Sequence, residues 1–327
     1  MRAIVVSGHG GPEVMHLGEL PTPAPGPGQL LVRIKAAGVN PFDTYIRAGI
    51  GTRPPLPYTP GDDGAGELAG FGEGAEESGR RAGDRVYLSG SLTGTYAEYA
   101  VCRRDQVHPL TSRVSYVEGA AVGVPYLTAY RALFQRAAAR AGETVLVHGA
   151  TGGVGLAAVQ LAVAADLIVI ATGGSDEGRR LALANGASEV LDHGAGDHFD
   201  AVLQLTHGHG VDVILEMRSD LNLGRDLPLL ARDGRVVCIG NRGPRNEGQV
   251  TVNARDLMRC DGVILGMLLP NADGESLVTA HRALDKGLAA GTLRPVVTRE
   301  LPLEEAAGAH REVMRSPSLG NIVLLTE

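Results

Sequence analysis

Short apolar runs separated by clusters of glycine and proline dominate the first 120 or so residues of the chain. The runs Ala3–Val6, Gln29–Ile34, Arg85–Leu88 and Tyr96–Val101 have the length of β-strands, and the segment Pro21–Gly28 is typical of an irregular connection. This pattern predicts a compact, barrel-like β domain with long connections. It does not predict an array of alternating strands and helices.

From about Ala120 the pattern changes to strand-length apolar segments that alternate with segments of helical period. One helix is expected over Leu127–Ala139, and another over Leu156–Ala165, directly after a glycine-rich turn. The expected strands are Glu143–His148, Leu167–Thr172, Glu189–Leu191, Val211–Met217, Arg235–Gly240 and Gly262–Gly266. Such alternation is typical of a doubly wound parallel sheet, and it places the chain in the α/β class.

The last 60 or so residues contain helix candidates at Gly274–Leu288 and Leu303–Arg315, then a strand candidate at Asn321–Leu325. We expect this tail to return to the first domain. A chain of 327 residues is long for a single core, so two domains are expected. The predicted boundaries are residues 1–121 with 267–327 for the β-rich domain, and residues 122–266 for the Rossmann domain.

Charge and cysteine content restrict the function classes. A net charge of −7 argues against nucleic acid or an anionic membrane as the main partner. The three cysteines, Cys102, Cys238 and Cys260, are far apart in sequence, so neither a disulfide framework nor a structural zinc clip is expected. The apolar run at Ala3–Val6 is too short for a secretory signal, and a reducing, cytoplasmic setting is the simplest interpretation.

The segment Val154–Ala171 is apolar enough to resemble a membrane span. It is interrupted by Gln160 and Asp166 and it follows a glycine-rich turn. We interpret it as a buried helix followed by a buried strand, because a membrane span needs about 20 consecutive apolar residues.

The glycine-rich turn is the strongest chemical signal. The strand ending at Val147 leads into Ala150-Thr151-Gly152-Gly153-Val154-Gly155, a variant of G-x-G-x-x-G with Ala150 in the place of the first glycine. A pyrophosphate can approach the backbone of Gly152, Gly155 allows the helix to lie close to the sheet, and the helix N-terminus offers N–H donors. The order of strand, turn, helix and second strand predicts a dinucleotide site.

The end of the second strand distinguishes NADP from NAD. An NAD enzyme usually carries an acidic residue there for the ribose 2′-hydroxyl, whereas this chain has Thr172-Gly173-Gly174-Ser175. With Arg179 and Arg180 downstream, the segment favours NADPH. Asp176 and Glu177 lie close by, and the arginines could equally form a solvated helix face, so NAD stays open as the alternative.

Taken together, these stretches resemble the zeta-crystallin/quinone oxidoreductase branch of the medium-chain dehydrogenase/reductase superfamily. The matching segments are Gly10–Val14, Ala37–Arg47, Pro57–Gly61, Pro125–Leu133, His148–Gly155 and Gly234–Val237. The resemblance implies a GroES-like β-rich catalytic domain beside the Rossmann domain. It also implies a homodimer, for which the strand Gly262–Gly266 is a plausible sheet edge.

The resemblance also implies a site without zinc. Zinc-dependent alcohol dehydrogenases of the superfamily carry a catalytic Cys where this chain has Asn40, His-Glu where it has Asp62-Asp63, and another Cys near Val124. Asn and Val cannot supply a zinc site. Without a Lewis acid, the hydride is expected to go to an acceptor that is already activated by conjugation.

In the resembling family, Asn40 and Tyr45 flank the nicotinamide, and Tyr45 offers its hydroxyl to an acceptor oxygen. Both could instead be structural, Asn40 as a loop start and Tyr45 as a packed side chain, and His193 could be only a solvated turn residue. The NADPH contacts correspond to Tyr45, Thr128, Ala150, Thr151, Gly152, Gly153, Val154, Gly173, Gly174, Ser175, Arg179, His193, Asn222, Ile239, Gly240, Asn241, Arg242, Met267, Leu268 and Leu269.

The leading functional prediction is an NADPH-dependent quinone reductase. The alternative within the same chemistry is reduction of the carbon–carbon double bond of 2-alkenals or enones. An alternative of another class is an NADPH-binding structural or RNA-binding protein with little turnover, which the acidic charge balance disfavours. His207 and His209 are interpreted as residues of a solvated loop, because no carboxylate or Cys is near them in sequence.

Three departures from the family pattern bear on the site. Asp166 stands where a glycine usually ends the helix in a left-handed conformation. The segment Pro244–Gln249 looks like a polar insertion at the cofactor rim, and Arg218-Ser219-Asp220 adds charge close to Asn222.

Overall fold

The computed structural model describes residues 1–75, 79–241, 248–315 and 317–327. The chain forms two compact units. The β-rich unit contains Met1–Val124, Ala283–Arg315 and Gly320–Glu327, and the Rossmann unit contains Pro125–Arg282 and Ser316–Leu319. The predicted domain boundaries after residues 121 and 266 stay a prediction.

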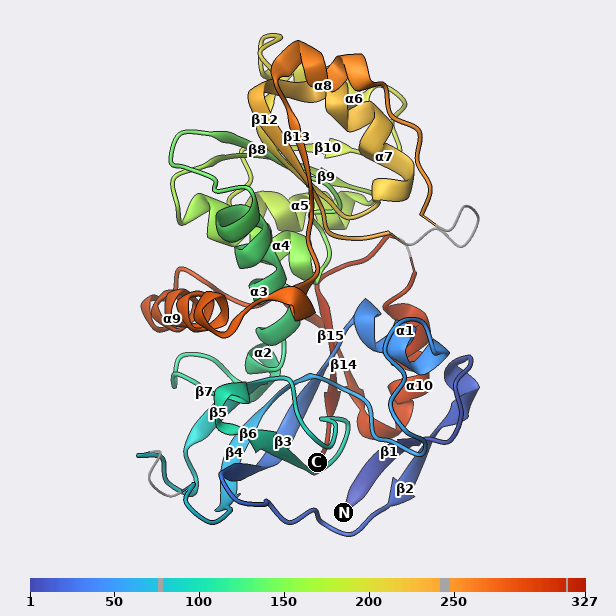
Figure 1. Ribbon diagram of the computed structural model, residues 1–327, viewed down its shortest axis with the longest axis vertical. Helices are drawn as coiled ribbons and strands as arrows, with labels where there is room; N and C mark the ends of the chain where they lie inside the picture. Colours follow the sequence, from blue (N-terminus) through green and yellow to red (C-terminus); the bar gives the residue numbers. More distant parts are fainter. Residues whose placement is uncertain (76–78, 242–247, 316) are drawn as a thin grey trace. The chain divides into compact units, whose positions relative to one another are not determined.

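A seven-stranded sheet is the main element of the β-rich unit (Figure 1). Its strand order is β14-β15-β3-β4-β5-β7, with β6 also paired to β3, and β1 and β2 form a separate antiparallel pair. The bounds are β1 Arg2–Val6, β2 Met15–Glu19, β3 Gln29–Val39, β4 Asp63–Phe71, β5 Arg85–Ser89, β6 Tyr99–Arg103, β7 Val107–Pro109, β14 Val297–Pro302 and β15 Asn321–Leu325. The predicted β-rich architecture is confirmed.

Strand β3 shows why this sheet forms. Leu30, Val32 and Ile34 are buried and point into the core, while Arg33 between them is exposed. This alternation with period two is the pattern of a strand with one buried face. Burying each of these side chains contributes about 1.5–3 kcal/mol, so β3 anchors the core of the unit.

Strand β4 was not predicted, because its several glycines interrupt the alternation of apolar and polar residues that indicates a strand. A Cβ at Gly66 would lie 1.9 Å from the carbonyl oxygen of Arg33, so only glycine fits this approach between β3 and β4. The register between the two strands shifts at the same place, between Ile34 and Ala36.

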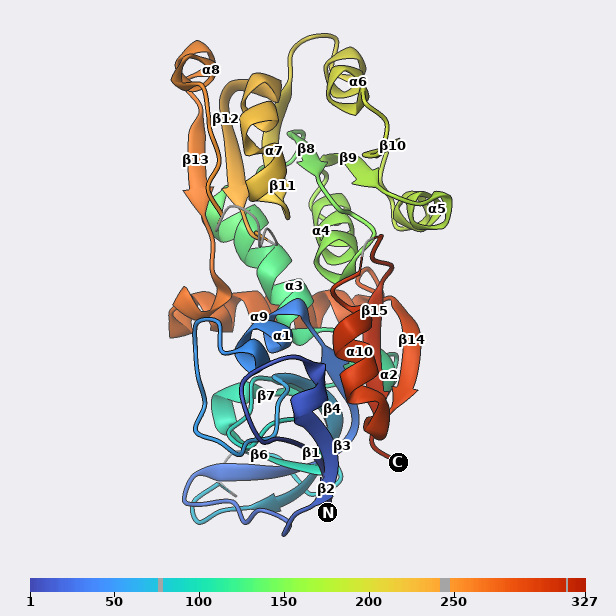
Figure 2. The ribbon, with the colours of Figure 1, turned by 90° about the vertical axis from the view of Figure 1, so that its right-hand side faces the viewer.

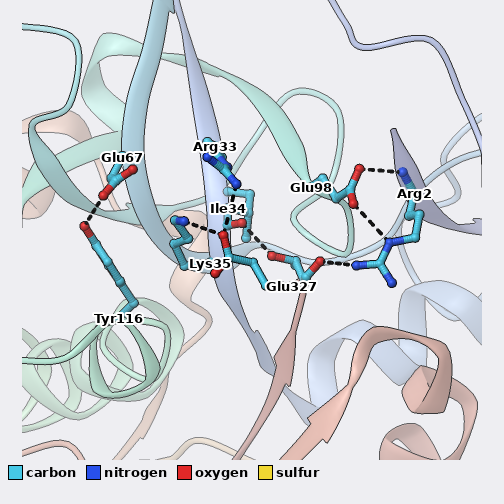
Figure 3. Close-up of polar contacts among 9 residues, drawn as sticks. Arg2, Arg33, Ile34, Lys35, Glu67, Glu98, Tyr116 and Glu327 are labelled. Carbon is cyan, nitrogen blue, oxygen red and sulfur yellow. Dashed lines mark hydrogen bonds and ion pairs between the residues drawn. The ribbon is translucent and has the colours of Figure 1, made fainter.

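The C-terminal segment completes the sheet. Strand β15 coincides with the strand predicted over Asn321–Leu325 and lies between β14 and β3, parallel to the first and antiparallel to the second. Figure 3 shows how the end of the chain is fixed: Arg2 donates to the carbonyl oxygen of Thr326 at 2.6 Å, and the carboxylate of Glu327 pairs with Arg33 and Lys35.

Short helices connect the strands of the β-rich unit. They are α1 Pro41–Ala48, α2 Tyr116–Gly119 and α10 Ala306–Glu312, with 3-10 turns η1 Pro12–Val14, η3 Arg104–Gln106 and η7 Leu303–Glu305. The helix predicted over Leu303–Arg315 is therefore divided into η7 and a shorter α10. Helix α1 begins at Pro41, a residue suited to the first helical position, and ends at Gly49, which has a left-handed φ of 77°.

The Rossmann unit contains a six-stranded parallel sheet in the order β10-β9-β8-β11-β12-β13. Figure 2 shows these strands side by side, from β13 at the left to β10 at the right. The bounds are β8 Thr144–Val147, β9 Ile168–Gly173, β10 Glu189–Asp192, β11 Val211–Glu216, β12 Leu230–Cys238 and β13 Val263–Gly266. Numbered along the chain this is 3-2-1-4-5-6, the order of dinucleotide-binding sheets, and its switch point lies between β8 and β11. The predicted doubly wound fold is confirmed.

The remaining helices are α3 Gly123–Tyr130, α4 Gly153–Val163, α5 Asp176–Ala184, α6 His198–Leu205, α7 Ser219–Asp226, α8 Ala254–Cys260 and α9 Gly274–Ala290, with 3-10 turns η5 Leu227–Leu229 and η6 Leu269–Asn271. The prediction of a single α-helix over Leu127–Ala139 is wrong in one respect. The α-helix α3 ends at Tyr130, and a π-helical segment, η4, follows over Arg131–Arg136.

The apolar segment Val154–Ala171 forms the buried helix and buried strand that were predicted, as α4 and β9. Asp166, between them, has a positive φ of 59°, so the left-handed position expected there is confirmed. Among the residues that the structure describes, none of the helices has the length and apolar character needed to cross a bilayer.

Candidate cofactor and active sites

The glycine-rich turn joins the end of β8 to the start of α4. The N-cap of α4, Gly152, is extended (φ −87°, ψ 176°) and has no side chain to cap the helix, and no described residue provides a side-chain acceptor for the first helical N–H groups. A Cβ at Gly155 would lie 2.4 Å from the carbonyl oxygen of Gly149, so the helix approaches the turn as closely as glycine permits. Free N–H donors at a helix N-terminus, with the positive end of the helix dipole, form a site for phosphate.

Two contacts fix the shape of this turn. Ala150 donates its N–H to the carbonyl oxygen of Thr172 at 2.9 Å, and Thr151 donates its hydroxyl to the carbonyl oxygen of Ser318 at 2.6 Å. A Cβ at Gly152 would lie 3.0 Å from the Oγ of Ser318, so the turn is narrow on this side. The residues present therefore fit a dinucleotide pyrophosphate.

The end of β9 brings together four residues predicted to contact the adenosine end of the cofactor. A Cβ at Gly174 would lie 2.5 Å from Nε2 of His193, and Arg179 donates to the carbonyl oxygen of Gly173 at 3.2 Å. Arg179 also pairs with Asp192 at 3.0 Å. The arrangement puts a guanidinium and an imidazole beside a strand end without an acidic side chain.

The two arginines of this region differ. Arg179 pairs with Asp176 as well as Asp192 and is mostly buried, whereas Arg180 is exposed. Ser175 caps α5 by accepting the N–H of Gly178 at 3.2 Å. Only Arg179 is placed beside the strand end, and its two carboxylate partners hold it there.

The opposite side of the switch point carries the residues predicted for the nicotinamide end. The carbonyl oxygen of Glu216, at the end of β11, accepts N–H groups from Ile239 at 2.9 Å and Gly240 at 3.2 Å. Asn222 donates its amide to the carboxyl oxygens of Glu216 at 3.2 and 3.3 Å. Met267 donates its N–H to the carbonyl oxygen of Cys238 at 3.0 Å.

The added charge before Asn222 is internally neutralised, because Arg218 pairs with Asp220 at 3.2 Å. Arg242 and most of the insertion Pro244–Gln249 lie outside the described residues. His207 and His209 are exposed in the turn after α6, in agreement with their interpretation as loop residues.

Two positions that correspond to zinc-ligand positions of the superfamily, Asn40 and Val124, meet in the β-rich unit at Asp63, the residue after the third such position, Asp62. Asn40 donates its amide to Oδ2 of Asp63 at 2.8 Å, and Val124 donates its N–H to both carboxylate oxygens at 2.9 Å. An amide N–H donor, an aliphatic side chain and a carboxylate already occupied by donors do not fit a zinc site. Burial raises the pKa of Asp63 to about 7.

A buried polar chain leads away from Asn40. Asp43 accepts the N–H of Asn40 at 2.8 Å and the hydroxyl of Tyr96 at 3.2 Å. The same hydroxyl lies 3.2 Å from Nε2 of His310, and Nδ1 of His310 lies 3.1 Å from Arg47. Burial raises the pKa of Asp43 well above its ordinary value and lowers the pKa of His310 to about 3. The sequence patterns singled out neither Tyr96 nor His310, since nothing in their spacing relates them to Asn40.

A cavity of about 490 Å³ opens beside this chain. The residues that line it include Asp43, Asp62, Ile46, Tyr58 and Leu92. Burial raises the pKa of Asp62. The lining thus combines apolar residues with two acids whose pKa values are raised.

Tyr45 lies on α1, two residues after Asp43, and is half-buried outside this lining. Its hydroxyl has no hydrogen-bond partner among the residues that the structure describes. It is therefore available to an external acceptor, unlike the hydroxyl of Tyr96.

Comparisons with known proteins agree with this geometry. Residues 26–112 match the family described as Alcohol dehydrogenase GroES-like domain, and residues 153–284 match Zinc-binding dehydrogenase. Quinone oxidoreductase from Lama guanicoe is 45% identical over 99% of this chain and 97% of its own length, and the human Quinone oxidoreductase is 42% identical over 99% and 98%. The chain belongs to the quinone oxidoreductase family of the medium-chain dehydrogenases/reductases. The predicted family membership is confirmed.

Solved structures support the same assignment. Escherichia coli quinone oxidoreductase complexed with NADPH superimposes with a TM-score of 0.88 at 30% identity, with full coverage of both chains. An NAD-dependent alcohol dehydrogenase superimposes with a TM-score of 0.91 at 32% identity, also with full coverage. The fold of this quinone oxidoreductase family member is therefore shared by proteins that use either nicotinamide cofactor.

Proposed function

We propose that the protein is an NADPH-dependent quinone reductase that works without a metal. The uncapped N-terminus of α4 at Gly152, at the switch point of a sheet with dinucleotide-binding order, is the observation that carries the proposal. Quinone oxidoreductase relatives over nearly the full chain, and the NADPH complex of the E. coli protein, support it.

The residues that would hold NADPH divide by part of the cofactor. The turn Ala150–Gly155 would bind the pyrophosphate, and Gly173, Gly174, Arg179 and His193 would bind the adenosine 2′-phosphate. Asn222, with the main chain at Ile239–Asn241 and Met267–Leu269, would hold the nicotinamide end. When bound, NADPH supplies a hydride; the protein supplies placement.

The β-rich unit would bind the acceptor. We propose that the cavity lined by Ile46, Tyr58 and Leu92 receives the quinone. Tyr45, which precedes Ile46 of this lining on α1, would donate a hydrogen bond from the cavity's edge to the acceptor oxygen that gains negative charge. Asp62 lines the same cavity with a raised pKa, and it would supply the proton that, with the hydride, converts a quinone to a hydroquinone.

The proposal excludes zinc on the basis of the donor set. Asn40 and Val124 are hydrogen-bond donors to Asp63, and neither side chain is a zinc ligand. Metal analysis of the purified protein is expected to find no stoichiometric zinc. One zinc per chain that is needed for turnover would contradict this part of the proposal.

Homodimerisation is part of the proposal. Strand β13 is at the edge of the parallel sheet, and Val263 (44% exposed) and Ile264 (37% exposed) leave apolar surface there. Pairing with β13 of a second copy would cover it. Light scattering coupled to gel filtration is expected to give twice the 34.0 kDa chain mass. A monomer at micromolar concentration would contradict it.

A reducing, cytoplasmic setting is also proposed. Cys102, Cys238 and Cys260 are all free thiols in the structure, as expected for a protein that is not stabilised by disulfides.

The decisive experiment is steady-state oxidation of NADPH against a panel of quinones and of 2-alkenals or enones. A preference for quinones is expected. A preference for enones would replace the leading function with double-bond reduction, which uses the same hydride and the same cavity. Tight NADPH binding without reduction of any acceptor would instead favour the structural or RNA-binding alternative.

A further inference from the structure

Three ionisable side chains meet at the switch point of the Rossmann sheet. His148, at the end of β8, places Nε2 2.9 Å from Oδ1 of Asp226 and 3.7 Å from Oε2 of Glu216. Glu216 and Asp226 are fully buried and His148 is 3% exposed. We call these three residues the buried triad. It lies in the same unit as the glycine-rich turn, and none of its members is among the predicted cofactor contacts.

Glu216 connects the buried triad to the nicotinamide side of the cofactor site. Its carboxyl oxygens accept the amide of Asn222 and the N–H of Arg218, and its carbonyl oxygen accepts the N–H groups of Ile239 and Gly240. One residue thus holds two of the three segments that carry the proposed nicotinamide contacts.

His148 connects the buried triad to the pyrophosphate side. Its Nδ1 lies 3.3 Å from the hydroxyl of Thr172, and that hydroxyl also accepts the N–H of Gly149 at 3.2 Å. The N–H of His148 itself bonds to the carbonyl oxygen of Leu215 at 3.1 Å. The triad is therefore linked by hydrogen bonds to both ends of the cofactor site.

The protonation of the buried triad follows from its surroundings. Burial raises the pKa of Glu216 to about 7. Burial alone would lower the pKa of His148, but the carboxylates of Glu216 and Asp226 raise it above its ordinary value. The raised pKa values of His148 and Glu216 favour a proton on each of these side chains near neutral pH, which avoids an uncompensated buried negative charge.

A carboxyl oxygen of Asp226 is a possible acceptor for the shared proton. Among the described residues, the buried Oδ2 of Asp226 has no hydrogen-bond donor. A protonated Glu216 would donate to the carboxyl group of Asp226. The other groups around the triad are His198 on α6, whose ring lies edge-on to His148 at 6.5 Å, His193 after β10, Cys238 on β12, and the ion pair of Arg218 with Asp220 on α7.

We propose that Glu216 is a positioning residue for NADPH: it orients Asn222 and the Ile239–Gly240 segment, and a proton shared within the buried triad holds that orientation. The proposal rests on the proposed function, since it assigns these segments to the nicotinamide end. Loss of the proton as the pH rises through about 7 leaves Glu216 and Asp226 without a shared proton. Repulsion between the two acids then shifts Glu216 together with the segments it holds, so hydride transfer declines.

The test compares two substitutions of Glu216 in the full-length protein. Glu216→Gln keeps the shape and donates to Asp226 without titrating. It is expected to bind NADPH within about twofold of wild type and to flatten the decline of kcat between pH 6 and pH 8. Glu216→Ala removes the acceptor for Asn222, and it is expected to lower kcat/KM for NADPH by about three- to tenfold, the effect of one neutral hydrogen bond.

Asp212→Asn is the matched control, because Asp212 lies at the other end of β11 and accepts the N–H of Thr144 at 2.7 Å. Its pH profile is expected to follow that of wild type. The inference is overturned if Glu216→Gln keeps the wild-type pH profile, or if Glu216→Ala, with a far-UV CD spectrum like wild type, keeps wild-type kcat/KM for NADPH. These two outcomes can be distinguished from a failure of the proposed function, because in that case the wild-type protein would not oxidise NADPH with any acceptor.

Discussion

The side-chain amide of Asn40 donates a 2.8 Å hydrogen bond to the buried carboxyl group of Asp63. The carboxyl group of Asp63 also accepts the N–H of Val124 at 2.9 Å. The Asn40–Asp63 bond fixes the start of α1 against β4, and it makes the stability of the β-rich unit depend on an uncharged residue at position 40.

Asn40→Asp is therefore expected to destabilise the protein by about 2–4 kcal/mol at pH 7, because it replaces a donor by a second buried acid beside Asp63. Urea unfolding followed by circular dichroism measures the change. Asn271→Asp, at an exposed position, is the control and is expected to change the free energy of unfolding by less than about 0.5 kcal/mol. Equal effects of the two substitutions would show that the Asn40–Asp63 bond contributes nothing.

His310 makes stability depend on pH in the acid range. The pKa of His310 is lowered to about 3 in the folded protein, while the unfolded chain has the ordinary value of 6.5. The unfolded state therefore binds the extra proton first, and stability falls as the pH decreases below about 6.5. Between pH 7 and pH 5 this residue is expected to cost about 2 kcal/mol.

His310→Gln keeps a polar side chain without this titration. Its free energy of unfolding is expected to fall less than that of wild type between pH 7 and pH 5. Parallel curves for the two proteins would mean that His310 is protonated in the folded state.

Gly155→Ala tests the approach of α4 to the turn. The added Cβ would meet the backbone at Gly149 and Ala150, where no flexible side chain can give way. We expect a loss of at least about 1 kcal/mol in stability and a weaker NADPH affinity, measured by thermal unfolding and by quenching of NADPH fluorescence. Gly196→Ala, which meets nothing within 4 Å, is the control that is expected to change neither.

Arg179 and Arg180 provide a matched pair for cofactor selection. Arg179→Ala is expected to raise the Kd for NADPH about tenfold and to leave the Kd for NADH unchanged, because only NADPH carries the 2′-phosphate. Arg180→Ala, at the exposed neighbouring position, is expected to change neither Kd. If both variants behave alike, the arginines are only a solvated helix face.

Tyr45→Phe tests the proposed hydrogen bond to the acceptor. The expected result is a decrease of kcat with quinones of at least about tenfold, because the lost hydroxyl stabilises the developing oxyanion. Tyr99→Phe on β6 is the control. If Tyr45→Phe keeps the wild-type kcat, Tyr45 is a packed structural side chain and does not bind the acceptor.

The parts of the fold that the sequence predicted best are those with dense apolar patterns. Strand β15 was located at its observed bounds, and β8 and β9 within about two residues, because buried parallel strands form continuous apolar runs. Strand β14, Val297–Pro302, was missed because only Leu301 in it is buried and the rest of the segment is polar or partly exposed.

Some residues of the candidate site could also be predicted from the sequence, and others could not. The glycine turn and Asn222 follow a local motif or a family correspondence, so they could be predicted. Glu216 and Asp226 are ten positions apart in the sequence, but their meeting with His148 depends on β8 and β11 being neighbours in the sheet. No local pattern encodes that pairing, and buried acids in a chain with 37 acidic residues give no signal of their own.

The position of β15 has a consequence for the way the chain is made. This strand sits between β14 and β3, so a segment near the C-terminal end of the sequence fills an interior place in a sheet begun by residues 29–39. The Rossmann unit is nearly continuous in sequence, so it can fold first during synthesis. Until β15 has been synthesised, the edge of β3 that pairs with it stays unpaired. Deletion of the last seven residues, 321–327, would leave that edge exposed, so ribosome stalling or premature termination there would yield an aggregation-prone product with an intact cofactor fold.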